Sequence, residues 1–125
     1  MSIGLARAAL AAASSCRADR SVVVPQIDAA RTALGDATAA LHEGLRSGAF
    51  VEKAAPLFEI RIRLAALAQQ AVQLELQASG GCAYLAEPPS GFGRRWREAA
   101  FVPVITPSIT QLQAELQGHA LARAA

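Results

Sequence analysis

The stretch from Leu57 to Ala78 constrains the fold most, because apolar residues recur in it with unbroken heptad spacing. The heptad positions are Leu57, Ile60, Leu64, Leu67, Ala71, Leu74 and Ala78. A second apolar stripe beside them comprises Phe58, Ile62, Ala65, Val72 and Leu76. Such a pattern predicts an α-helix, and a helix with so wide an apolar surface contacts more than one neighbour.

Prolines and glycines divide the rest of the chain into further helices. We predict them at about residues 3–20, 26–46, 90–100 and 107–123, around the long one at 57–78. Pro25 separates the first two predicted helices, since the residue before a proline disfavours the helical conformation. Pro56 marks either the start of the long helix or a kink in it, and Gly80 and Gly81 end it. Thr106 is predicted to cap the last helix, with Pro107 at its first position.

This pattern predicts an all-α fold, an antiparallel four-helix bundle with a short extra helix, in a single domain covering residues 1–125. Apolar residues make up 53% of the chain but aromatic residues only 5%. The core must therefore be filled by closely packed helices rather than by large rings. Because one bundle covers only part of both apolar stripes, we expect a homodimer or higher oligomer through helix faces that include residues 57–76.

Charge and cysteine content exclude several classes of protein. The net charge of +2, from eleven arginines and one lysine against ten acidic residues, is too small for a nucleic-acid-binding face. No apolar run reaches the ~18 residues that a membrane span needs. Arg7 lies inside the apolar N-terminal stretch, which favours a helix over an export signal. Cys16 and Cys82 have no metal-ligand spacing, so we expect reduced thiols and a cytoplasmic location.

Few residues point to chemistry on their own. His42 and His119 fall on different helices without acidic or cysteine companions, which favours surface positions. The three arginines of the "RRWR" segment either bind an anion or pair with Glu87 and Glu98. Solvated helix faces account for most of the remaining glutamates, which are Glu43, Glu52, Glu59, Glu75 and Glu115.

Three segments together carry a family resemblance. In order along the chain they are "GLARAALAAASSCRADR", "QASGGCAYL" and "RRWREAAFVPVITPS". In this order and spacing they resemble the C-terminal helical domain of the acyl-CoA dehydrogenase family, and the match covers nearly the whole chain. The resemblance implies a four-helix bundle that forms the oligomer interfaces and completes an FAD site, largely that of a neighbouring subunit.

The resemblance also implies which residues contact the cofactor. Arg20 matches the family arginine at the end of the first helix, which contacts the flavin pyrophosphate. Gln77, Gly80 and Gly81 match a Gln-x-x-Gly-Gly segment along the adenosine-diphosphate half of FAD. Bare backbone at the two glycines would let a dinucleotide come close. Within the third segment, Arg97-Glu98-Ala99 matches an Arg-Asp-Ala of the family, a structural element.

Two departures from the family pattern change the expected activity. Val23 and Val24 replace a Phe-Gly pair after the family arginine. Thr106 occupies the position where many members carry the glutamate that removes the α-proton of the acyl thioester. Threonine cannot act as that base at neutral pH, so we expect no catalytic residue in this chain.

The resemblance covers only the helical domain, and this leads to our functional expectation. We expect a small subunit of a split or heteromeric acyl-CoA dehydrogenase-like flavoprotein that acts on a thioester of coenzyme A or a carrier protein. A companion flavoprotein chain would supply the other domains, and FAD would bind only with that partner. The alternative is a flavin-free dimeric bundle that serves as a small biosynthetic enzyme, such as a cyclase, or as a binding or scaffold protein.

Overall fold

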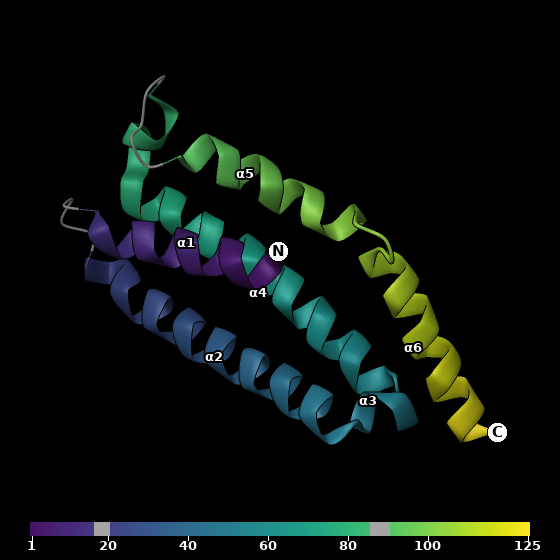
Figure 1. Ribbon diagram of the computed structural model, residues 1–125. Coiled ribbons are helices and arrows are strands. Elements are labelled where there is room, and N and C mark those ends of the chain that lie inside the picture. Colours follow the sequence, from purple (N-terminus) through teal and green to yellow (C-terminus); the bar gives the residue numbers. More distant parts are fainter. Residues whose placement is uncertain (17–20, 86–90) are drawn as a thin grey trace.

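The computed structural model describes residues 1–16, 21–85 and 91–125 (Figure 1). Over these residues the fold is all-α, as predicted, and contains no strand. The helices are α1 (Ser2–Ser15), α2 (Val24–Ser47), α3 (Ala49–Glu52), α4 (Ala55–Ser79), α5 (Phe92–Phe101) and α6 (Ile109–Ala124). Three short 3-10 segments join them: η1 (Ser21–Val23), η2 (Gly80–Tyr84) and η3 (Val102–Val104).

Helix α4 is the central element. Its 25 residues contact α1, α2, α5 and α6, as the predicted double stripe requires. Pro56 lies in its first turn, so this proline marks the start of the helix and not a kink. Gly80 follows the last helical residue with φ of +59°, a conformation that side-chain-bearing residues avoid, and thereby stops the helix.

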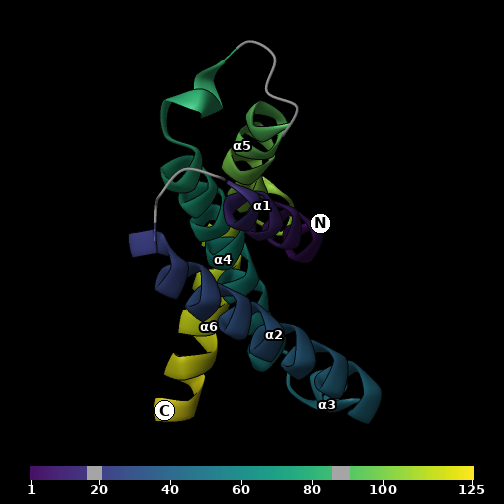
Figure 2. The ribbon, with the colours of Figure 1, turned by 90° about the vertical axis from the view of Figure 1, so that its left-hand side faces the viewer.

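Helix α1 packs against α4, and several of the most deeply buried residues of both helices are alanines. Ala6 and Ala9 on α1, and Ala68 and Ala71 on α4, are almost completely buried. Small side chains let two helix backbones approach closely, which accounts for a core with so few aromatic rings. The two helices run in the same direction, so their C-terminal ends lie at the same end of the molecule (Figures 1 and 2).

Helices α2, α5 and α6 run antiparallel to α4 (Figure 1). Helix α2 packs along one side of it, while α5 covers its C-terminal half and α6 its N-terminal half (Figures 1 and 2). The η3 segment joins α5 to α6. The predicted last two helices thus follow one another along α4. A guanidinium nitrogen of Arg61 donates to the carbonyl of Ile105 at 3.3 Å and ties this junction to α4.

Several predicted helix boundaries were wrong. Helix α1 ends at Ser15 rather than near residue 20, because Ser14 and Ser15 hydrogen-bond back to the carbonyls of Leu10 and Ala12. Residues 17–20 lie outside the described part of the chain. Helix α2 begins two residues earlier than predicted, and α3 was not predicted at all. Phe50 of α3 packs directly over Gly44 of α2, where a Cβ atom would lie 2.0 Å from the ring.

The predicted cap of the last helix was also wrong. Ser108, not Thr106, caps α6, which begins at Ile109. The backbone N–H of Gln111 donates to Ser108 Oγ at 3.3 Å, and the N–H of Ser108 donates to Gln111 Oε1 at 2.7 Å. This reciprocal capping box satisfies two otherwise unpaired donors, whereas Thr106 is exposed before the cis bond to Pro107.

Replacement of Ser108 by alanine is therefore expected to lower the free energy of unfolding by about 0.5–2 kcal/mol, the usual effect of losing such a cap. The same replacement at Thr106 should change it by no more than about 0.5 kcal/mol, the range for surface substitutions. Chemical denaturation of both variants measures the difference. An equal or larger loss in Thr106→Ala would contradict the observed cap.

Candidate functional site

The strongest candidate site lies where α1 and α4 end together. Cys16, directly after α1, places its Sγ 3.2 Å from Oγ of Ser79, the last residue of α4. These two residues are 63 positions apart in the sequence. The contact brings the chain segment that precedes Arg20 next to the segment that contains Gln77, Gly80 and Gly81.

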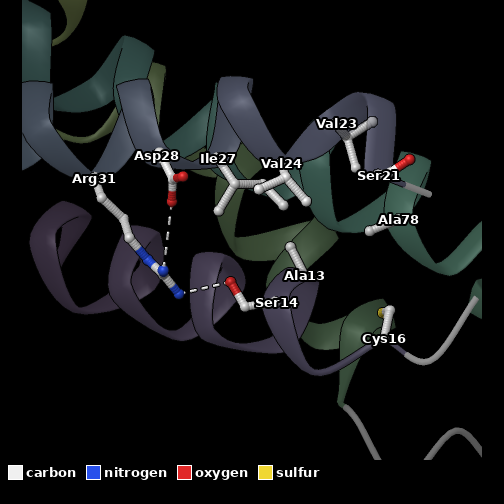
Figure 3. Close-up of a pocket in the computed structure, with 10 residues that line it drawn as sticks. All are labelled: Ala13, Ser14, Cys16, Ser21, Val23, Val24, Ile27, Asp28, Arg31 and Ala78. Atoms are coloured by element: carbon white, nitrogen blue, oxygen red, sulfur yellow. Dashed lines mark hydrogen bonds and ion pairs between the residues drawn. The ribbon is translucent and has the colours of Figure 1, made fainter. Parts of the chain in front are cut away.

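A cavity of about 440 Å³ opens beside this contact (Figure 3). Its apolar wall includes Ala13 from α1, Ala78 from α4, Val23 from η1 and Ile27 from the first turn of α2. These four side chains are buried and belong to the core. The half-buried Cys16 lines the same cavity. The site is thus an apolar pocket formed by three helices.

Arg31 and Asp28 are the charged residues among those that line the cavity. Arg31 donates a 2.6 Å hydrogen bond from Nη2 to Ser14 Oγ, and its Nη1 lies 3.8 Å from Asp28 Oδ1 (Figure 3). The guanidinium therefore already links α2 to α1. Both members of the ion pair are substantially solvent-exposed, so the pair contributes little to stability.

The residues that the resemblance assigns to the dinucleotide lie at this end or outside the described chain. Gln77 and Gly81 are exposed and Gly80 is partly buried. A Cβ atom at Gly81 would meet no heavy atom within 4 Å, so open space lies over this backbone. Arg20 lies outside the described residues, four positions after Cys16.

Thr106 is not brought to this site. Its neighbour Ile105 contacts Arg61 in the N-terminal half of α4, whereas Gly80 follows the C-terminal end of that helix. At a rise of 1.5 Å per residue, these two levels of α4 are about 28 Å apart. Within one copy of the chain, Thr106 and the paired glycines therefore cannot act on the same atoms of a ligand.

One important pair of residues was missed from the sequence. Glu75 is fully buried, and Arg95 of α5 donates to its two carboxylate oxygens, from Nε at 2.8 Å and from Nη2 at 2.5 Å. Glu75 is thus an exception to the expectation that solvated faces account for most of these glutamates. The hydrogen bonds to this carboxylate raise the pKa of Arg95 above its ordinary value, against the effect of burial. Arg95 is therefore a structural cation that fixes α5 on α4.

The remaining candidate residues are at the surface. Arg94 pairs with Glu98 at 3.3 Å, one of the two alternatives left open by the sequence, whereas Glu87 lies outside the described residues. His42 and His119 are exposed, as predicted. Among the residues described, no group of His, Cys, Asp and Glu is arranged to hold a metal ion. No helix in this part of the chain is both long and apolar enough to cross a membrane.

In comparisons with known proteins, no protein-family model, no curated protein and no solved structure matches the chain.

Proposed function

We propose that this chain is a helical subunit of a heteromeric, acyl-CoA dehydrogenase-like flavoprotein that acts on an acyl thioester of coenzyme A or a carrier protein. The end at which α1 and α4 terminate contributes to the site for the adenosine-diphosphate half of FAD. The observation that carries this proposal is the contact between Cys16 and Ser79. It unites two distant segments, each of which the resemblance links to the same cofactor.

Electrostatics gives each segment a distinct role in this proposal. The C-terminal end of a helix carries a partial negative charge, which is unfavourable next to a pyrophosphate. Cations are therefore needed where α1 and α4 end, and in the sequence Arg17 and Arg20 follow the last residue of α1 by two and five positions. The exposed backbone around Gly81 offers the uncharged surface that an adenosine ring and its ribose can approach.

We also propose how the helices form a bundle, how the chain assembles and where in the cell it is located. Helices α1, α2 and α4 form three members of a four-helix bundle, and α5 with α6 forms the fourth. The chain assembles as a homodimer or higher oligomer and joins a companion flavoprotein chain in the cytoplasm. That companion holds the isoalloxazine ring and supplies the catalytic base, because Thr106 cannot.

The apolar cavity supports a second candidate function, a flavin-free bundle that binds or converts a small apolar molecule. Its volume of about 440 Å³ lies within the range of small-molecule sites. Its two charged lining residues, Asp28 and Arg31, lie within ion-pair distance of each other and leave the wall formed by Ala13, Val23 and Ile27 apolar. In this case the cavity itself, and not the glycine backbone beside it, would be the site.

Titration of the isolated chain with FAD, followed by fluorescence anisotropy of the flavin, tests the first proposal. Stable retention of FAD requires the companion chain, which holds the rest of the site. For the isolated chain we therefore expect only weak binding, with Kd of about 0.1–1 mM, or about 4–5.5 kcal/mol. Riboflavin, which lacks the pyrophosphate and adenosine, should bind at least about tenfold more weakly, the effect of losing a charge-assisted contact. Because binding is weak, the purified chain should be colourless.

Two arginine variants provide the matched comparison. Arg20→Ala should weaken FAD binding by about 10-fold or more, as expected for loss of a charge-assisted hydrogen bond. Arg7→Ala, an exposed arginine in the first half of α1, should leave it unchanged. Equal binding of FAD and riboflavin, or equal effects of the two variants, would contradict the proposal. Binding of an apolar fluorescent probe without any response to FAD would favour the second candidate function.

A further inference from the structure

The solvent-facing side of the C-terminal half of α4 carries no charge. Between Leu64 and Leu85 the sequence contains one charged residue, Glu75, and it is fully buried. The exposed positions of this part of α4 are Ala66, Gln69, Gln70, Gln73 and Gln77. At 100° per residue they fall within a single stripe along the helix.

This stripe borders a groove shared with α5. The groove has a volume of about 450 Å³, and Trp96 and Ala100 of α5 line it opposite Gln69, Gln70 and Gln73. Trp96 stays 38% exposed although its ring lies against that of Phe92, with centroids 5.6 Å apart. We refer to these five groove residues of α4 and α5 as the glutamine face.

The lack of charge distinguishes this face from other parts of the surface. The exposed side of α2 carries several charged side chains, which are Asp28, Arg31, Asp36, Glu43 and Arg46. The N-terminal half of α4 itself exposes Glu59 and Arg63. Depletion of charge together with an exposed tryptophan is typical of the centre of a protein–protein interface.

We propose that the glutamine face is the contact between two copies of this chain, related by a two-fold axis. In such a contact each residue near the axis faces its own counterpart, so a charged side chain there would meet a like charge. A glutamine amide both donates and accepts hydrogen bonds. Gln70 and Gln73 can therefore pair with the same residues of a second copy, which neither a lysine nor a glutamate can do.

This surface differs from the apolar stripes from which the sequence predicted an oligomer. Ala65, Val72 and Leu74 are buried within the chain itself, so they are not available to a second copy. The inference names the surface for the homo-oligomer of the proposed function but does not depend on flavin binding, which concerns the end of α4. Failure of this contact would therefore leave the proposed FAD site standing, and failure of FAD binding would leave the contact standing.

Two double variants with opposite charges test the contact. They are Gln70→Lys/Gln73→Lys and Gln70→Glu/Gln73→Glu. Light scattering after size exclusion at about 50 μM protein, above the micromolar Kd of ordinary weak interfaces, should give a dimer mass for the unmodified chain. Each double variant alone should give half that mass. An equimolar mixture of the two should return to the dimer mass, because lysines then face glutamates.

The matched control introduces the same charges at Gln113 and Gln117, which are exposed on α6, and should remain dimeric. Circular dichroism should show unchanged helix content in every variant. A monomeric unmodified chain, dimeric double variants, or double variants whose mixture stays monomeric would each overturn the proposal. Restoration of the dimer by mixing excludes misfolding as the cause of dissociation.

Discussion

Replacement of Glu75 by alanine is expected to lower the free energy of unfolding by about 3–5 kcal/mol, because it leaves the buried guanidinium of Arg95 without its carboxylate. Both carboxylate oxygens accept hydrogen bonds from Arg95, and Glu75 has no exposed surface. A domain of ordinary size has only about 5–15 kcal/mol of stability in total. This single change should therefore remove a large part of it, as measured by urea denaturation.

Two further variants separate the buried charge from other causes. Glu98→Ala breaks the exposed pair with Arg94 on the same helix α5 and should cost no more than about 1 kcal/mol. Glu75→Leu/Arg95→Met removes both charges and should recover most of the stability, since an apolar pair can replace a buried ion pair. A loss below about 1 kcal/mol in Glu75→Ala, similar to that of an exposed pair, would contradict the structural role of this ion pair.

Leu112→Ala should destabilise the protein by about 2–5 kcal/mol, the usual cost of removing a buried leucine side chain. Leu112 is 2% exposed and is the buried residue of α6, so it provides the main apolar contact of this helix. Leu121→Ala is the matched control on the same helix, because Leu121 is 73% exposed. It should change stability by no more than about 0.5 kcal/mol.

Thermal and urea unfolding of both leucine variants measure this difference. If α6 opens separately from the rest of the chain, hydrogen exchange in residues 109–124 should accelerate in Leu112→Ala before that of α4 does. Similar stability of the two leucine variants would contradict the docking of α6 through Leu112.

The long helix and the class of the fold could be predicted because apolar periodicity reports burial directly. The heptad positions Leu64, Leu67 and Leu74 are all buried, as the pattern indicates. The helix ends were predicted less well, since they depend on local hydrogen bonds. For α6 the signal was nevertheless present: Ser108 precedes Gln111 by three residues, which is the spacing of a capping box.

The buried ion pair shows a limit of reasoning from residue type. Glu75 was grouped with four other glutamates on helices of mixed charge, and solvated faces were expected for most of them. Its position could have corrected this, since it follows Ala71 by four and Ala68 by seven residues, and both alanines are fully buried. That Arg95 is its partner could not be predicted, because the register between α4 and α5 depends on the loop that joins them.

The candidate site could be predicted only in part. Alternation of direction in the expected bundle places the first and third long helices parallel, so their C-terminal ends meet. The contact of Cys16 with Ser79 agrees with this. The apolar cavity beside it could not be predicted, because it arises from the way in which η1 leads into α2 over Ala13 and Ala78.

Residue-level mapping of FAD on the isolated chain tests the central claim most directly. Backbone amide spectra of isotope-labelled protein are recorded during titration with FAD in the millimolar range, where weak complexes of about 4 kcal/mol form. We expect the largest chemical-shift changes at Cys16, Gly80 and Gly81, and none at Ile109 on the distant helix α6. Shifts confined to other surfaces, or no shifts at the paired glycines while FAD is bound, would contradict it.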